Sequence, residues 1–212
     1  MLYIIYNEKR YKLRAGLYKI MAKNDLSAGT VYQLKVTLRD ISPPIWRRIQ
    51  VKGAITLLKL HNVLQAVMGW EDYHLHQFEI DGISYTRPLP YDPIPNELGQ
   101  EDERRRRLNR MVTSENERFL YEYDFGDSWM HEILVEKILP PDPEMRYPVC
   151  LKGKRACPPE DVGGPWGYAD FLEIIQDPND PEREEYLVWA GEEFDPEYFD
   201  LDEVNGALRK MK

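Results

Sequence analysis

The chain has 212 residues and a formal net charge of −9, with 42% hydrophobic and 31% charged side chains. This is the composition of a globular domain and not of a disordered or fibrous chain, and no apolar run approaches the roughly 18 to 20 residues that a membrane span needs. Because the first apolar run, residues 2–6, is also too short for a signal peptide, we expect a cytoplasmic protein without membrane contact.

The first thirty residues have no clear hydrophobic period and mix tyrosines with basic side chains. We expect residues 1–30 to form a disordered or loosely attached leader, with a short strand over residues 3–6 as the alternative. Translation from Met1 and translation from Met21 both fit this pattern. Residues 31–212 then have the length of a single domain, which we expect to be α+β with an acidic helical region at its C-terminal end.

Two strands are predicted at the start of this domain. Residues 31–41 alternate between apolar and polar side chains, and residues 45–51 form a second strand after Pro43 and Pro44 have turned the chain. Arg47 interrupts the apolar face of the second strand. We therefore expect an exposed strand end or a partner carboxylate at this position.

A helix is predicted over residues 56–70, because its apolar side chains recur at helical spacing. Thr56 is placed to cap its N-terminus and Gly69 stands where a C-cap belongs. We expect this helix to lie across the sheet. His61 borders the apolar stripe, which favours packing or hydrogen bonding over a chemical role.

Residues 74–85 predict a hairpin that turns at Asp81 and Gly82, a pair typical of two-residue turns. His74 and His76 fall on the same face of its first strand. Two histidines at this spacing can bind one metal ion, but the face is apolar, so buried imidazoles with satisfied nitrogens are the alternative.

The segment 87–117 contains four prolines followed by QEDERRRRLNRM. Acidic residues before basic ones at helical spacing predict a short surface helix with internal ion pairs. The alternative is a patch for anions or nucleic acid made by Arg104, Arg105, Arg106, Arg107 and Arg110. Because the acidic chain as a whole repels phosphate backbones, nucleic acid binding is expected only through this patch.

The segment RFLYEYDFGDSWMHEILVEKI, residues 118–138, predicts the central β-hairpin. Alternation places one aromatic face on its first strand, made by Phe119, Tyr121, Tyr123 and Phe125. Polar groups gather at its turn, so the candidate catalytic residues are Asp124, Asp127 and His131. The candidates for binding a partner are Tyr121, Tyr123, Trp129 and, further along the chain, Trp166.

A loop rich in proline and glycine is predicted over residues 147–168, and it contains the two cysteines. Long loops in compact domains are more often functional than decorative. Thiolate and imidazole ligands suit zinc, so the candidate metal ligands are His131, Cys150, Cys157, His74 and His76. The spacing C-x6-C is less specific than paired CxxC motifs, and free buried thiols are the alternative.

Three helices are expected after this loop, over residues 168–175, 180–191 and 200–211, the last with a capping box at its start. Residues 177–203 contain twelve acidic side chains against one basic side chain, Arg183. This acidic stretch is either a solvated face or a docking surface for a basic partner.

Five segments resemble the signature of the Ri-plasmid open-reading-frame-three-like family, which occurs on plasmids and insertion elements: YQLKVTLRDISPPIWRRI, LHNVLQAVMGWEDYHLHQFEIDG, YEYDFGDSWMHEI, RACPPEDVGGPWGY and FDPEYFDLDEVN. The resemblance covers about residues 31–206. Relatives carry a third cysteine where this chain has Val162, so Cys150 and Cys157 lack a ligand unless His131 or a carboxylate joins them. Some members carry a resolvase-like label, but this chain has neither an activated nucleophile on a helical scaffold nor a basic helix-turn-helix.

The predicted fold is α+β, with a β-grasp-like antiparallel or mixed sheet, a helix on one face and a C-terminal helical appendage. No Walker loop, nucleotide-binding glycine motif, GxSxG elbow or HExxH motif is present. The first functional hypothesis is a protein or peptide interaction module of mobile elements. The second is a metal-assisted hydrolase-like enzyme with its site at the 124–131 hairpin and the 150–164 loop, and the third is a DNA-associated accessory protein.

Overall fold

The computed structural model describes residues 29–88, 100–191 and 193–211. Apart from residues 29 and 30, the predicted leader lies outside the described residues, as does the alternative strand over residues 3–6. None of the helices in the described part combines the length and apolarity that a bilayer span requires.

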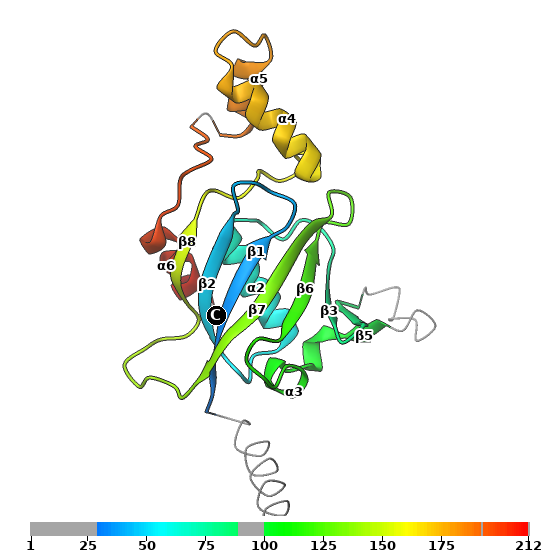
Figure 1. The fold of residues 1–212 in the computed structure, drawn as a ribbon, viewed down its shortest axis with the longest axis vertical. Helices are drawn as coiled ribbons and strands as arrows, with labels where there is room; N and C mark the ends of the chain where they lie inside the picture. The colour runs from blue at the N-terminus through cyan, green and yellow to red at the C-terminus, as the bar shows by residue number, and fades with distance from the viewer. Residues whose placement is uncertain (1–28, 89–99, 192, 212) are drawn as a thin grey trace, which may run out of the picture.

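The core of the fold is one mixed sheet, shown in Figure 1, with the strand order β5-β4-β3-β6-β7-β1-β2-β8. Neighbouring strands are antiparallel except for the parallel pair β4 and β5. The strands are β1 (Val31–Leu38), β2 (Trp46–Lys52), β3 (His76–Ile80), β4 (Ile83–Thr86), β5 (Gln100–Asp102), β6 (Arg118–Tyr123), β7 (Trp129–Leu139) and β8 (Val149–Lys154). The predicted α+β class with a mixed sheet is confirmed.

Helix α2 (Leu57–Met68) covers one face of the sheet, behind the strands in Figure 1. It begins and ends as its sequence predicts, because the Thr56 side chain accepts from the Lys59 N–H and Gly69 adopts the left-handed conformation with φ 89°. The alternating residues of β1 and β6 bury their apolar faces toward the same core. His61, on this helix, is fully buried.

Arg47 differs from its prediction, because it is 3% exposed and has no carboxylate partner among the described residues. Its Nε donates to the carbonyl of Val67 at 2.8 Å, and its Nη1 donates to the carbonyl of Lys154 at 2.9 Å. The guanidinium also lies 4.6 Å from the ring centroid of Phe199. A buried cation is tolerated here because backbone carbonyls and an aromatic ring replace its hydration.

Short helical turns occupy the arginine-rich segment, namely η2 (Glu103–Arg105) and α3 (Leu108–Met111). The predicted surface helix with internal ion pairs is wrong, because the acidic partners in the pairs Arg104–Asp102 and Arg106–Glu101 lie on strand β5 and not on a helix. Glu103 departs from that pattern, because it is fully buried.

The prediction of a loop over residues 147–168 was wrong in part, because this segment contains strand β8 and the first turn of α4 (Gly164–Gln176). Helix α5 (Arg183–Trp189) follows, and α6 (Leu201–Lys210) returns to the sheet. In Figure 1, α4 and α5 project beyond one end of the strands, whereas α6 lies beside β8. The Asn205 side chain of α6 bonds to both backbone groups of Cys150 and so covers part of this sheet edge.

Candidate metal centre

Three segments that are distant in sequence meet at one end of the sheet. They are residues 70–76 after α2, the turn 124–128 between β6 and β7, and the loop 155–163 between β8 and α4. The Asp124 N–H donates to the carbonyl of Leu75 at 2.9 Å, and the Trp70 indole N–H donates to the carbonyl of Pro158 at 3.0 Å. These bonds bring together the hairpin turn and the proline-rich loop.

The hairpin turn is shaped by its own polar residues. Asp124 and Ser128 have φ values of 57° and 52°, a left-handed conformation that aspartate tolerates better than most residues. The Asp124 Oδ1 accepts from the Gly126 N–H at 2.9 Å, which closes an Asx turn. The other oxygen of Asp124 faces the neighbouring segment.

The loop before α4 is held against this turn by a glycine pair. The Gly163 N–H donates to Asp127 Oδ2 at 3.0 Å. Gly164 has φ 71°, and a Cβ built there would lie 2.5 Å from the backbone oxygen of Asp127. Only glycine permits this approach without displacement. Asp127 therefore positions the loop.

A histidine and three carboxylates converge where the segments meet. His74 Nε2 lies 3.1 Å from Asp161 Oδ1 and 3.8 Å from Glu160 Oε2, and His74 Nδ1 lies 3.7 Å from Asp124 Oδ2. One ligand atom each from His74, Asp124 and Asp161 lies within 4.8 Å of the others. The side chain of Asp161 is 68% exposed, so solvent reaches the cluster.

The charge of this cluster is not balanced by a permanent cation. Among residues 29–88, 100–191 and 193–211, no lysine or arginine forms an ion pair with Asp124, Glu160 or Asp161. The His74 Nε2 atom is buried and has no hydrogen-bond partner in the same described ranges, although it points among carboxylates. Close carboxylates repel one another, and a bound cation relieves that repulsion.

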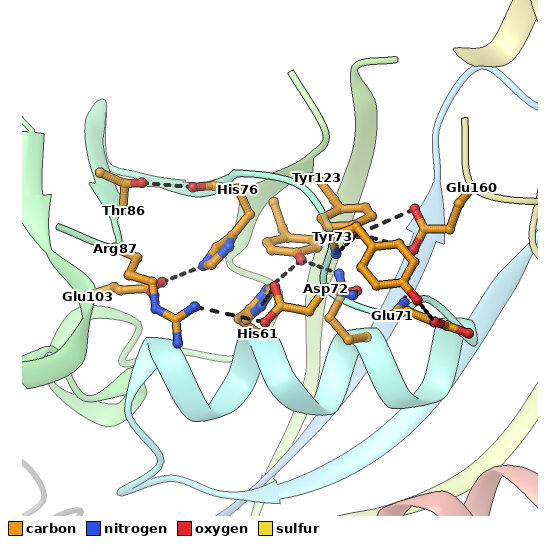
Figure 2. A network of polar contacts seen from close by, with 12 residues as sticks. His61, Glu71, Asp72, Tyr73, His76, Thr86, Arg87, Glu103, Tyr123 and Glu160 are labelled. Atoms are coloured by element: carbon orange, nitrogen blue, oxygen red, sulfur yellow. Dashed lines mark hydrogen bonds and ion pairs between the residues drawn. The ribbon is translucent and has the colours of Figure 1, made fainter. Parts of the chain in front are cut away.

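Glu160 is fixed in place by two donors. Its Oε1 accepts from the Glu71 N–H at 2.9 Å and from the Tyr123 hydroxyl at 3.1 Å. Burial, and then the charge of Glu160, raises the pKa of Tyr123, so the phenol keeps its proton and remains a donor. Figure 2 shows Glu160 reaching from its loop toward the Tyr123 hydroxyl.

A second polar network lies beside this cluster and contains two stacked histidines (Figure 2). His61 Nδ1 lies 2.8 Å from the Tyr121 hydroxyl, which also accepts from Gln65, and His61 Nε2 lies 2.9 Å from Asp72 Oδ1. The hydroxyl proton therefore points to His61 Nδ1, and the Nε2–H donates to Asp72. His76 Nε2 pairs with Glu103 at 2.9 Å.

The geometry of the stacked pair does not suit a shared metal ion. Ligand atoms of His61, Asp72 and His76 also lie within 4.8 Å of one another. However, the two rings are 3.5 Å apart and only 4° from parallel. A metal ion lies close to the plane of each imidazole that binds it, and parallel planes at this separation do not meet. We therefore place this network outside the candidate metal centre.

The remaining predicted ligands lie elsewhere. His131 is buried in the sheet, where a ring nitrogen lies 2.9 Å from the Trp129 carbonyl. Cys150 is on β8, which β1 and β2 separate from the strand of His131. Cys157 contacts Arg47 and Met68, and burial raises the pKa of both thiols. Neither cysteine joins a group of three potential ligands in the described part of the chain.

The residues predicted to bind a partner differ in how exposed their side chains are. Tyr121, Tyr123 and Trp129 are fully buried, so they shape the core beneath the site and offer no surface to a partner. Trp166 is 86% exposed at the start of α4. Of the sequence-predicted residues, the structure brings His74 and Asp124 into the cluster and places Asp127 beside it.

Sequence reasoning missed Glu160 and Asp161, which supply two of the four groups in the cluster. The signal was present in the order of residues 158–164, Pro-Pro-Glu-Asp-Val-Gly-Gly, where two carboxylates precede a glycine pair. Their approach to His74 depends on tertiary contacts that no local pattern encodes.

The chain is therefore an α+β protein with a mixed sheet, and one histidine and three carboxylates lie close together at the sheet's end. The family model for the plasmid pRiA4b ORF-3-like protein matches residues 30–203. The chain belongs to this family. It is 38% identical over 182 residues to the uncharacterized protein y4hQ of Sinorhizobium fredii, covering 85% of this chain and 91% of the relative.

A solved structure has the same fold. The crystal structure of MM3350, a protein of unknown function from Methanosarcina mazei Go1, superposes with a TM-score of 0.75 and 43% sequence identity. The match covers 83% of this chain and 98% of the archaeal chain.

Proposed function

We propose that this protein binds one divalent metal ion through His74, Asp124 and Asp161, with the carboxylate of Glu160 beside the ion. The observation that carries the proposal is that one ligand atom each from His74, Asp124 and Asp161 lies within 4.8 Å of the other two. Carboxylate oxygens and imidazole nitrogen together suit zinc or manganese. Asp127 acts outside the ligand set by holding the 163–164 backbone.

The chemistry that follows is metal-assisted hydrolysis. A metal ion with an open coordination position lowers the pKa of bound water and polarises a substrate oxygen. The exposed Asp161 and partly exposed His74 leave one side of the cluster open to solvent, as a catalytic site requires. Glu160 would stand beside the ion with its carboxylate already oriented, because the Tyr123 hydroxyl and the Glu71 N–H hold it.

Isothermal titration calorimetry tests this proposal. Zinc and manganese are titrated separately into tag-free protein stripped with EDTA, and we expect one ion to bind per chain. His74→Ala and Asp161→Asn each remove a ligand, so both are expected to weaken binding by about 100-fold or more.

Cys157→Ser is the matched control, because Cys157 lies in the same loop but outside the cluster. It is expected to bind the ion as the unmodified protein does. Equal affinity of His74→Ala and the unmodified protein, or loss of binding in Cys157→Ser alone, would refute the proposal in favour of a thiolate site.

A second candidate function is interaction with a protein or peptide. It is favoured by large apolar side chains that remain exposed on the segments forming the site, where Tyr73 is 69% exposed, Leu75 48% and Phe125 45%, and by Trp166 on the adjoining helix α4, which is 86% exposed. Exposed apolar side chains gathered near one site favour a binding surface. The two functions are compatible, because a partner docked on these segments would lie beside the metal ion.

A further inference from the structure

We infer that a pocket between α5 and the loop at residues 161–162 binds an arginine or lysine side chain of a protein partner. The inference rests on the second proposed function, the protein interaction, and does not require a metal ion. The pocket has a volume of about 380 Å³ and is lined by Asp161, Val162, Glu182, Glu185, Tyr186 and Trp189. Side-chain binding sites of this kind combine concave shape with a few charged groups.

The charge of the pocket is complementary to a cation. Three of its six lining residues are carboxylates, Asp161, Glu182 and Glu185. In the described ranges of the chain, none of them forms an ion pair with a lysine or arginine. A cationic side chain entering here therefore meets three carboxylates that no lysine or arginine of the described residues neutralises, and only Asp161 has a histidine, His74, beside it.

The single basic residue of the acidic stretch does not fill this pocket. Arg183 donates from its Nε to the carbonyl of Ile175 at 2.9 Å, which ties it to the end of α4. It lines a different hollow, together with Glu184 and Leu187. The two sides of α5 thus differ: one places carboxylates beside aromatic rings, and the other carries the arginine.

The aromatic walls suit an organic cation better than a bare metal ion. The rings of Tyr186 and Trp189 lie 6.3 Å apart at 79°, and both pack against Phe171, at 6.1 and 6.0 Å. This packing holds the two rings in place while Trp189 stays 48% exposed. Ring faces attract guanidinium and ammonium groups, and guanidinium also stacks on them.

The pocket adjoins the candidate metal centre through one shared residue. Asp161 lines the pocket and also lies 3.1 Å from His74. A partner anchored by a basic side chain in the pocket would therefore place the adjoining part of its chain next to the metal ligands.

Nuclear magnetic resonance of the tryptophan indole N–H groups tests the inference. The full chain, kept in EDTA so that no metal ion contributes, is titrated with N-acetyl-arginine amide and, in parallel, with the neutral isostere N-acetyl-citrulline amide. We expect saturable shifts of the Trp189 signal with arginine, with a Kd on the order of 1 mM, and no saturable shift with citrulline. Trp189→Phe identifies the signal by removing it.

Glu185→Gln and Glu184→Gln form a matched pair, because they make the same charge change on the same helix but only Glu185 lines the pocket. Glu185→Gln is expected to weaken arginine binding by about tenfold, and Glu184→Gln to leave it within about twofold. Equal shifts with citrulline, equal effects of the two variants, or a response at Trp166 in place of Trp189 would overturn the inference. A chain that binds zinc at His74 but gives one of these results contradicts the pocket alone.

Discussion

His61 and His131 are buried as neutral imidazoles in the core beneath the site. Burial, followed by the neighbouring His76 and Arg87, lowers the pKa of His61 to about 2. Burial also lowers the pKa of His131 to about 4. Both rings are fully buried, so the folded protein resists protonation at positions where the unfolded chain accepts a proton near pH 6.5.

These two histidines make stability depend on pH. Between pH 6.5 and pH 5 the unfolded state binds up to two protons that the folded state does not, so stability is greatest above pH 6.5 and falls as pH decreases. We expect the free energy of unfolding to fall by about 3 kcal/mol over this range, with His61 and His131 contributing equally. Urea unfolding at several pH values measures this loss.

His131→Gln isolates one of the two contributions. The slope of stability against pH, and not the absolute stability, is the quantity compared, so any packing defect of the variant cancels. We expect the loss between pH 6.5 and pH 5 to be roughly halved. Unchanged stability of the unmodified protein across this range would show that these imidazoles are protonated in the folded state.

Single residues were the hardest features to predict from sequence. Arg47 looked like an interruption of a strand face, and its actual partners, the carbonyls of Val67 and Lys154, belong to other elements. Glu103 looked like part of a surface helix, yet it is buried against His76, 27 residues away in sequence. Periodicity shows which face a residue occupies, but not which distant groups compensate a buried charge.

At the scale of elements, the sequence predicted helix ends correctly where capping residues were present. Thr56 and Gly69 cap the two ends of α2 as expected. Asp200 caps α6, because its side chain accepts from the N–H groups of Asp202 and Glu203. Strand β8 was missed because it is an edge strand with a mainly half-exposed and polar sequence, VCLKGK, in which only Cys150 is buried. Edge strands lack the strong alternation that marks central ones.

The glycine at the start of α4 determines whether the loop reaches the hairpin turn. Gly164→Ala would place a Cβ 2.5 Å from the backbone oxygen of Asp127 and so push the loop carrying Glu160 and Asp161 away from His74. We expect zinc affinity to fall by about 10- to 100-fold, as it does when groups supporting metal ligands are displaced. Calorimetry with the folded variant measures this.

Gly191→Ala is the control for backbone strain. Gly191 also has a positive φ, 99°, but a Cβ there meets nothing within 4 Å. This variant is expected to keep the zinc affinity of the unmodified protein. Equal losses of affinity in the two glycine variants would mean that strain in the chain, and not the contact with Asp127, controls the site.

At the scale of the whole molecule, the site is a product of topology. The order of β3, β6 and β7 in the sheet places the segment before β3 beside the turn that joins β6 to β7. The sequence predicted His74 and Asp124 separately, and it predicted that the hairpin and the following loop share a site. It assigned the ligands of that loop to Cys150 and Cys157, because thiols are the more conspicuous metal ligands, whereas the loop brings Glu160 and Asp161 to the turn.

The most direct test of the metal centre is anomalous diffraction at the zinc edge from crystals of the full chain soaked with zinc. We expect one strong peak about 2.0 to 2.2 Å from a ring nitrogen of His74 and from oxygens of Asp124 and Asp161. A strong peak beside Cys150 or Cys157, or between His61 and His76, with none at His74, would contradict the account.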